Sequence, residues 1–519
     1  MLARERAVPI LTSVGQSRGI ESSRWEAWTP LTAILVLQGV VTVALARNTA
    51  FQDEANYLYA GRQTFEAWLG APLVLQPWAS YLSGYPYVYP LLAGILDMQF
   101  GLEAVRLLSL AWMMLATTVV YSAAGSLYDR ESAFYAAAIY AVQGPVLFLS
   151  GLATYDAMTV GWLAISFVLA LRVSSKPGTA RAVALGLLLV MAFITKYAGM
   201  LFIPSVIAIA GWQTWRHHGW KLARRYVATT TGVVVALIVI FLITMADARH
   251  AFFGSTAARV IVDAIPRSQL IRMVTDAGWP MILAAFVGTI LGGRKHLPIA
   301  IILFGTALLA PAYHIYKQEP VSLYKHLAYG FMFGAPVAGH ALARLVGYVR
   351  SLRAGPLHNT PWIVGLAACL LLFGSGLQQA EAQYNEWPNA RALVQLLRTQ
   401  VRPTTRILAE EYEVPRYYLQ DVMQTWQWTG LDWLDYTNSK GQTFSDNDAY
   451  RAAIDDGYFD IVVLRFGFDV TRARMIEGEL ERTPRYSLLA ELPFTTSVGT
   501  GQYKIWIRNG NGPPVPRGG

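Results

Sequence analysis

The stretch TPLTAILVLQGVVTVALARNTAFQDEANYLYAGR, residues 29–62, decides how this chain folds. Its first half is an apolar run, and its second half opens with two adjacent carboxylates, Asp53 and Glu54. A helix that crosses a bilayer needs about 20 predominantly apolar residues, so this run is long enough to enter one. The two acids therefore stand where the chain leaves a membrane, a costly place for charge that calls for a reason.

Apolar runs of this kind recur along most of the 519 residues. The composition is 54% hydrophobic and 14% charged, with a mean hydropathy of +0.35, whereas a soluble protein carries about a quarter charged residues. We therefore predict a polytopic α-helical membrane protein with about 11 transmembrane helices. The eleven apolar segments are 29–46, 103–127, 132–150, 157–172, 182–195, 200–212, 226–246, 279–292, 298–313, 327–343 and 361–377. Segments 182–195 and 200–212 are short, and they could also form one long helix.

The Lys and Arg residues predict the orientation of these segments. With the N-terminus inside, the inside segments carry 17 Lys and Arg, whereas the outside loops before the last span carry 9 although they are longer in total. Cytoplasmic loops are enriched in Lys and Arg. The basic stretches 215–225 and 292–296 are therefore expected inside, and the C-terminal residues outside. Because most of the Lys and Arg residues behind the net charge of +9 follow the expected membrane orientation, we expect no nucleic-acid partner.

Beyond the last apolar segment the composition turns polar and ordinary. Three stretches have the pattern of strands, namely TRILAEE (405–411), FDIVVLRF (459–466) and YKIWIR (503–508). Two others have the pattern of helices, namely NARALVQLLRTQ (389–400) and AYRAAIDDG (449–457). We predict a transmembrane domain over residues 1–377, an external α/β domain over 378–508 and a disordered tail over 509–519.

The first outside loop, residues 47–102, is unusually long. Tyr57 belongs to one stripe of an amphipathic helix, and Tyr85 and Tyr87 belong to a strongly aromatic stretch. Tyr and Trp at this density suit the interface between lipid headgroups and water. The loop is therefore expected to lie on the membrane surface and to cover a cavity, with its tyrosines either anchoring it or stacking on a ligand.

Asp53 and Glu54 begin the first helix of this loop. Negative charge is favoured at a helix N-terminus, so a capping role is the simplest interpretation. Ionisable groups at a membrane boundary are also functional candidates by default. A further acid, Asp156, stands at the next outside loop, and basic residues collect in the later outside loops.

Four stretches carry a family resemblance: DEANYLYAGR (53–62), EAVRLLSLAWMMLATTVVYSAAGSLYDRESAFYAAAIYA (103–141), SGLATYDAM (150–158) and GLLLVMAFITKYAGMLFIP (186–204). Together they resemble the GT-C glycosyltransferases, and more narrowly the protein O-mannosyltransferase-like branch that includes the bacterial lipid A aminoarabinose transferases. The resemblance covers about residues 25–345. It implies a GT-C-like protein of the bacterial inner (plasma) membrane, active on its external face. Such a protein moves a sugar from a polyprenyl-phosphate-linked donor to a glycan, lipid or protein acceptor.

The resemblance also implies roles for single residues. Asp53 and Glu54 match the family's acidic pair in the first outside loop, and Asp156 matches its Asp at the start of the fourth span. Lys196, in the pair Thr195–Lys196, matches the Lys of its fifth-span motif. The three acids are thus catalytic candidates, and Lys196 is a donor-phosphate candidate.

Transfer with inversion needs one carboxylate that takes the proton of the acceptor hydroxyl as its oxygen attacks the anomeric carbon. We expect Asp53 to be this base. Glu54 or Asp156 would orient the acceptor or, as a weaker alternative, hold a divalent metal. The leaving lipid phosphate is a tolerable anion, so nearby cations rather than a strong acid are expected to stabilise it.

Candidates for the phosphate side are Lys196, Arg249 and Arg259, with Lys325 and His326 in second rank. Arg249 and Arg259 lie in an outside loop whose basic character violates the positive-inside trend, and an anionic lipid headgroup would explain this. A snorkelling role for Lys196 and a solvated role for each arginine remain open. The candidates for substrate contact are Tyr57, Tyr85, Tyr87 and Tyr197.

Two other classes of function remain as alternatives. A transporter or flippase for a lipid-linked saccharide would also need buried charges, but it would place them near the middle of the spans. A scaffold whose external domain binds partners would use Asp53 only as a cap. The chain has no Gly-rich phosphate loop on a strand-to-helix turn, which disfavours a nucleotide-sugar donor.

Overall fold

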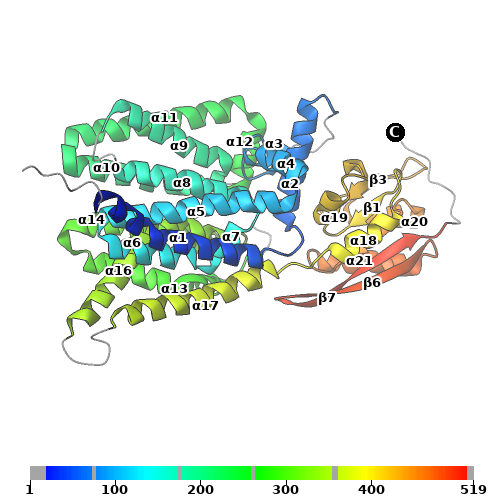
Figure 1. The fold of residues 1–519 in the computed structure, drawn as a ribbon. Coiled ribbons are helices and arrows are strands. Elements are labelled where there is room, and N and C mark those ends of the chain that lie inside the picture. Colours follow the sequence, from blue (N-terminus) through cyan, green and yellow to red (C-terminus); the bar gives the residue numbers. More distant parts are fainter. Residues whose placement is uncertain are drawn as a thin grey trace, which may run out of the picture.

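The computed structural model describes residues 19–72, 78–172, 177–256, 258, 264–352 and 360–510. The tail that was predicted to be disordered lies, from residue 511 on, outside these described residues. The chain forms a helical bundle with a sheet-containing domain at one end (Figure 1). The protein is thus a membrane protein of the expected class, with helices first and an α/β domain last.

The bundle is built from the predicted apolar segments. Its helices are α1 (Gly19–Leu45), α5 (Leu102–Leu127), α6 (Arg130–Ala141), α7 (Gly144–Ser150), α8 (Tyr155–Arg172), α9 (Thr179–Thr195), α10 (Ile203–His218), α11 (Trp220–Thr244), α12 (Ala246–Ser255), α13 (Arg267–Leu291), α14 (Gly293–Ala307), α15 (Leu309–Lys317), α16 (Leu323–Ser351) and α17 (Trp362–Tyr384). In the part of the chain that the structure describes, seven helices are long and apolar enough to cross a membrane, or eight if α6 and α7, which are bent by 68°, form one broken span. Shorter apolar helices cover Thr29–Leu45 and Thr179–Thr195.

The segment 182–212 forms two helices rather than one. The α-helix α9 ends at Thr195, Lys196 has an extended backbone, and a 3-10 turn (Tyr197–Phe202) leads into α10. Both α9 and α10 pack against α8 and against α11. A continuous helix from Thr179 to His218 would be about 60 Å long, too long to pack on α11 along its whole length.

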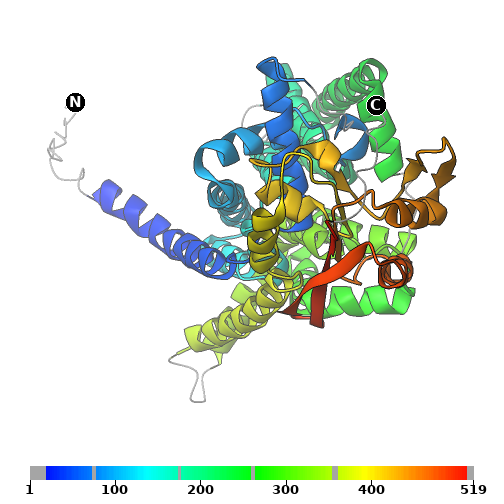
Figure 2. The same cartoon turned by 90° about the vertical axis from the view of Figure 1, so that its right-hand side faces the viewer.

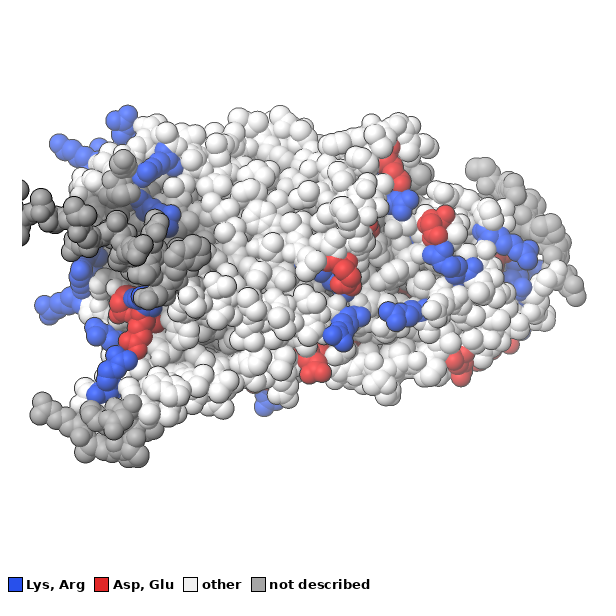
Figure 3. Space-filling model, viewed as in Figure 1, with Lys and Arg blue, Asp and Glu red and all other residues white. Residues whose placement is uncertain are grey.

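Charge is distributed unevenly along the bundle. Figure 3 shows Lys and Arg gathered at the end of the bundle that is far from the C-terminal domain, and a middle band almost free of charged residues. Large apolar side chains of the bundle helices are exposed, among them Val40, Ile243 and Leu371. A band of this kind is what a bilayer covers.

Helix α16 runs through the centre of the bundle, where it packs against α5, α6, α13 and α14. Nearly every side chain from Leu327 to Ala343 is buried. The packing is close because small residues face neighbouring backbones: a Cβ on Gly330 would lie 2.5 Å from the carbonyl oxygen of Ala307. Since α16 is fixed on all sides, the side chains of its first two turns are held in place.

Three helices of the first loop lie between the bundle and the C-terminal domain. They are α2 (Gln52–Trp68), α3 (Trp78–Tyr81) and α4 (Tyr89–Phe100). Helices α2 and α4 cross so closely that a Cβ on Gly61 would lie 1.8 Å from the carbonyl oxygen of Pro90. Figure 2, which looks from the C-terminal domain along the bundle, shows this domain over α2 and α4, with α1 and α17 at the periphery. Helices α2 and α4 thus stand at the junction of the bundle and the C-terminal domain, while Trp68 and Phe100 at their ends stay exposed.

The C-terminal domain is a five-stranded mixed sheet with helices on both faces. Its elements are α18 (Arg391–Gln400), β1 (Ile407–Ala409), α19 (Glu413–Tyr418), β2 (Trp428–Thr429), β3 (Asp435–Thr437), β4 (Thr443–Ser445), α20 (Asp446–Asp456), β5 (Ile461–Leu464), α21 (Val470–Arg482), β6 (Tyr486–Thr496) and β7 (Gly499–Arg508). The strand order is β2-β1-β5-β7-β6: β1 pairs in parallel with β2 and β5, and β7 pairs antiparallel with β5 and β6. Alternate residues of β5 face two cores, Val462 with α20 and α21, and Val463 with α18.

Candidate active site

Asp53 and Lys325 form an ion pair at the C-terminal-domain end of the bundle. Asp53 lies in the first turn of α2, Lys325 lies in the first turn of α16, and Oδ2 of Asp53 is 2.5 Å from Nζ of Lys325. The Asp53 side chain is 33% exposed, whereas that of Lys325 is 9% exposed. Asp53 is therefore the accessible member of the pair, and the lysine holds it from the buried side.

A second pair, Asp156 with Lys196, lies deeper. The ammonium group of Lys196 donates to Oδ1 of Asp156, and the Tyr329 hydroxyl donates to the same oxygen over 2.9 Å. Asp156 is fully buried, and its Oδ2 has no hydrogen-bond partner among the described residues. A buried carboxylate oxygen without a donor is costly, which marks it as an atom with capacity for a ligand.

Electrostatics and an aromatic stack connect the two pairs. Lys325 interacts electrostatically with Asp156 as well as with Asp53. The rings of Tyr57 and Tyr155 stack at 4.3 Å, and the Tyr57 hydroxyl donates to that of Tyr155 over 2.7 Å. Lys196 lies 5.1 Å from the centre of the Tyr155 ring. The structure thus brings Asp53, Asp156, Lys196, Lys325 and Tyr57 together.

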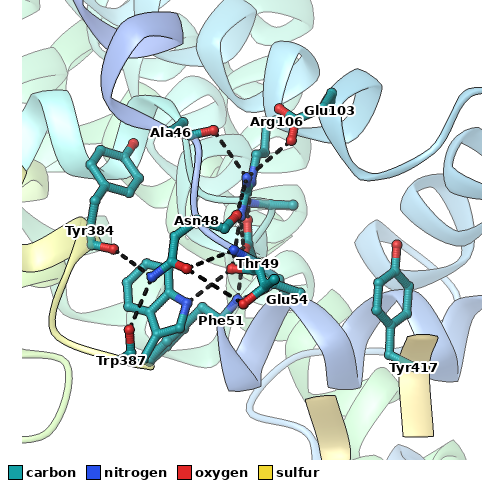
Figure 4. Close-up of polar contacts among 12 residues, drawn as sticks. Ala46, Asn48, Thr49, Phe51, Glu54, Glu103, Arg106, Tyr384, Trp387 and Tyr417 are labelled. Carbon is teal, nitrogen blue, oxygen red and sulfur yellow. Dashed lines mark hydrogen bonds and ion pairs between the residues drawn. The ribbon is translucent and has the colours of Figure 1, made fainter. Parts of the chain in front are cut away.

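Glu54 has a different place from its neighbour. It is fully buried, and its carboxylate accepts four hydrogen bonds: two from Arg106, one from the Ala153 amide and one from the Phe51 amide (Figure 4). Its pairing with the Phe51 amide closes the start of α2, as a capping box does. Both carboxylate oxygens are thus already used, so the geometry favours a structural role for Glu54 over the catalytic one that was expected.

Arg106 ties this acid to the chain that leaves α1. Its guanidinium donates to the backbone oxygens of Ala46 and Asn48 over 3.1 and 3.0 Å, and it pairs with Glu54 at 2.8 Å (Figure 4). Arg106 is itself only 3% exposed. The segment that presents Asp53 is therefore held by one buried arginine on α5, a residue that sequence analysis did not single out, because it stands inside an apolar segment.

The C-terminal domain fastens to the same segment. The Trp387 indole donates to the backbone oxygen of Thr49 over 2.9 Å, and the Ala390 amide donates to the Thr49 hydroxyl over 3.0 Å. The Tyr418 hydroxyl accepts from the Ala50 amide over 2.8 Å. Contacts to α2 and α4 follow from Gln52 to Glu413 (3.0 Å), from Arg416 to Asn56 (3.0 Å) and from Tyr417 to Asp97 (2.7 Å).

The carboxyl ends of the parallel strands carry acids near this contact. Burial raises the pKa of the Glu411 carboxyl to about 7, against the opposing effect of Arg465, with Glu413 and Glu410 raising it further. Burial also raises the pKa of the Glu413 carboxyl. Crevices at the carboxyl ends of parallel strands are common ligand positions in α/β domains.

The remaining predicted residues that the structure describes, apart from His326, form no hydrogen bond or ion pair with the side chains of Asp53, Asp156, Lys196 and Lys325. Arg249 is exposed on α12 and forms no ion pair with a described residue, and Arg259 lies outside the described residues. The Tyr85 hydroxyl contacts Sδ of Met245 at 3.5 Å, and Tyr87 is 40% exposed and stacks on Trp68. Tyr197 is buried in an aromatic cluster with Phe193 and Phe252, and its hydroxyl has no partner among the described residues.

His326 does lie at the site, together with a residue that sequence analysis missed. Its Nε2 is 3.9 Å from Oδ1 of Asp156, and its Nδ1 is 2.8 Å from Nε2 of His314. The spacing of 12 residues in the sequence gives no sign of this contact, because it needs the reversal of the chain between α15 and α16. Among the residues that the structure describes, no group of three or more His, Cys, Asp and Glu is arranged to hold a metal ion.

Comparison with known proteins extends these observations. Residues 84–245, about a third of the chain, match the family of dolichyl-phosphate-mannose-protein mannosyltransferases. Comparison with curated proteins gives no match.

Several solved structures share the fold. ArnT from Cupriavidus metallidurans in the apo state has 13% sequence identity and a TM-score of 0.61, over 95% of this chain and 100% of that one. The same protein bound to undecaprenyl phosphate also gives 13% and 0.61, over 94% and 100%. The archaeal oligosaccharyltransferase AglB from Archaeoglobus fulgidus, in complex with an inhibitory peptide and a dolichol-phosphate, gives 13% and 0.51, over 93% of this chain and 75% of that one. About a third of the chain thus matches that mannosyltransferase family, and nearly the whole chain shares the fold of ArnT.

Proposed function

We propose that this protein is an inverting glycosyltransferase that moves a sugar from a polyprenyl-phosphate-linked donor to a glycan, lipid or protein acceptor. The observation that carries the proposal is the pairing of one accessible carboxylate with buried lysines at one end of the bundle. Asp53 supplies the base, and Lys196 and Lys325 supply cations at the depth where a lipid phosphate would lie. A proton acceptor beside an anion site is what transfer from a sugar phosphate needs.

In this mechanism Asp53 takes the proton of the acceptor hydroxyl while the acceptor oxygen forms its bond to the anomeric carbon. The bond from that carbon to the phosphate oxygen breaks, and the lipid phosphate leaves toward the lysines. Lys325 pairs with Asp53, so a donor phosphate would compete with this carboxylate for the same ammonium group. Loading of the donor would then free Asp53 to act as base.

The remaining predicted residues take supporting roles in this proposal. Glu54 acts through Arg106 to place the start of α2, and Asp156 orients Lys196 and the bound substrate. Tyr57, Tyr85, Tyr87 and Tyr197 remain candidates for substrate contact, and Arg249 and Arg259 for the lipid phosphate. The donor class is supported by the solved structures of ArnT with undecaprenyl phosphate and of AglB with a dolichol-phosphate.

We place the protein in the inner (plasma) membrane of a bacterium, with the site and the C-terminal domain on the external face. The support is the gathering of Lys and Arg at the opposite end of the bundle (Figure 3). A transporter would hold its charges near the middle of the spans, whereas Asp53, Asp156, Lys196 and Lys325 all stand at the first turn of a helix or at a break beside the external domain.

The substitution Asp53→Asn tests the proposal, because it removes the base while keeping the shape of the side chain. The purified protein should lose about 10²–10⁴-fold in turnover with a polyprenyl-phosphate-linked sugar, while it still binds undecaprenyl phosphate. Asp247→Asn is the matched control, since Asp247 is an exposed acid in the first turn of α12 at the same end of the bundle. Full activity of the Asp53→Asn protein would overturn the assignment.

A further inference from the structure

His314 and His326 form a buried pair behind the acid and lysine cluster. His314 belongs to α15 and is 1% exposed, and His326 belongs to the first turn of α16. Nε2 of His314 lies 2.8 Å from Nδ1 of His326. Nδ1 of His314 lies 2.6 Å from the backbone oxygen of Glu319, in the turn between the two helices. Both nitrogens of His314 are therefore engaged, one of them by a group that can only accept.

This carbonyl fixes where the hydrogens lie. Because a backbone oxygen accepts and never donates, Nδ1 of His314 must carry a hydrogen. In the neutral pair, Nε2 of His314 is then bare and accepts from Nδ1–H of His326, which leaves Nε2 of His326 bare. One added proton places a hydrogen on Nε2 of His326, whichever of the two rings carries the charge. The pair thus holds or releases one proton, and it does so at a single atom.

That atom faces the site. Nε2 of His326 is buried without a hydrogen-bond partner among the described residues, 3.9 Å from Oδ1 of Asp156. Oδ2 of Asp156 is likewise buried without a partner. A bare ring nitrogen and a carboxylate oxygen, both buried without a donor, leave capacity for a group that carries a hydrogen. The charged and titratable groups around His326 are His314, Asp156, Lys196, Lys325 and Tyr329.

The balance of charge shows why a proton is needed here. Asp53 and Lys325 cancel, and so do Asp156 and Lys196, so the four groups carry no surplus positive charge for a ligand. When the sugar leaves, a phosphodiester monoanion becomes a phosphate monoester with two negative charges. Such a dianion is tolerable in water, but in a buried site with no surplus cation its second charge is costly.

We propose that His326 is the proton donor to the departing lipid phosphate, and that His314 is a positioning residue that keeps the transferable proton on Nε2. This inference rests on the proposed function and deepens it. As the bond from the anomeric carbon to the phosphate oxygen breaks, the electron pair stays on that oxygen, and the proton on Nε2 of His326 passes to the phosphate. The acceptor proton goes separately to Asp53, so the bond changes balance, and solvent later resets both groups.

Burial beside two lysines holds the pKa of His326 well below its ordinary value, so the pair loses its proton at lower pH than a free imidazole does. The test therefore measures pH profiles between pH 4.5 and 8 for the full-length protein with the variants His326→Gln and His314→Gln. In the wild type, turnover should fall at high pH as the pair loses its proton. His326→Gln should lower turnover at least tenfold at low pH and remove this fall. In His314→Gln the new amide can still accept from His326 but cannot carry the proton, so the position of the fall should shift. A merely structural role would lower turnover by one factor at every pH.

The affinity for undecaprenyl phosphate gives a second readout that needs no turnover. If one proton is held between His326 and the phosphate, affinity should fall with rising pH by up to tenfold per pH unit in the wild type and less steeply in both variants. His340→Gln is the matched control, since His340 is buried on the same helix and contacts Ser132 instead. Binding and turnover profiles that keep the wild-type shape in both variants would overturn the inference. If the wild type transfers no sugar while the binding of undecaprenyl phosphate shows the expected pH dependence in the wild type and both variants, the proposed function alone would be refuted.

Discussion

Replacement of Glu54 by Gln separates a structural acid from a catalytic one. Gln has nearly the same shape but no charge, so Arg106 would lose its buried ionic partner and keep Glu103, whose side chain is 71% exposed. Removal of one member of a buried pair costs about 3–5 kcal/mol, because the other charge stays buried without compensation. We therefore expect Glu54→Gln to destabilise the protein by about 3–5 kcal/mol.

The control for this substitution lies three residues from Arg106. Glu103→Gln removes the exposed partner of the same arginine, 3.2 Å from its Nη1, and should cost no more than about 1 kcal/mol. The double variant Glu54→Gln/Arg106→Gln should recover part of the loss, because it also removes the uncompensated charge.

The assay is thermal unfolding of the purified protein in detergent, with intrinsic tryptophan fluorescence as the signal. Glu54→Gln should lower the midpoint temperature clearly more than Glu103→Gln does. Equal midpoints for the two single variants would refute the reasoning. A Glu54→Gln protein of wild-type stability without turnover would show instead that Glu54 takes part in the chemistry.

Two further predictions concern the loop beside Lys196 and the pH response of the C-terminal domain. A Cβ on Gly84 would lie 2.1 Å from the carbonyl oxygen of Thr195. Gly84→Ala should therefore lower both the unfolding midpoint and turnover. The control is Gly232→Ala, at a helical position with open space, which should not lower the midpoint. Because the folded state raises the pKa of Glu411 to about 7, the protonated form is favoured, and its stabilisation is present below the unfolded pKa and lost as pH rises through 7. The lost folding stability is at most about 3 kcal/mol, and solvent screening reduces it because 23% of the Glu411 side chain is exposed. Glu411→Gln should therefore flatten the change of the unfolding midpoint between pH 4.5 and 8.

Much of the fold follows from one-dimensional patterns. Apolar length predicts the long bundle helices but not α12, which lies in a stretch that was expected to be an outside loop. The strand-like stretches became β1, β5 and β7. The bend between α6 and α7 was missed, because the apolar pattern runs on across it. Strand β6 was missed because Leu488, Leu489 and its polar neighbours do not alternate cleanly.

The site was predictable where the cost of charge marks it. Asp53, Asp156, Lys196 and Lys325 stand at membrane boundaries, where an ionised group needs a partner. What the sequence could not show is which of the adjacent acids Asp53 and Glu54 is buried, since this depends on the direction of Arg106. The contact of His314 with His326 likewise depends on tertiary structure, and no local pattern reports it.

The fastening of Thr49 and Ala50 to Trp387, Ala390 and Tyr418 has a consequence for engineering. The two halves of the molecule share the short connection that leads to Asp53, so they are not modular. A chimaera that grafts a foreign external domain onto this bundle must bring matching groups for that connection, or Asp53 will lose its alignment. Changes of acceptor preference are therefore better sought by altering surface loops within the native domain than by swapping it whole.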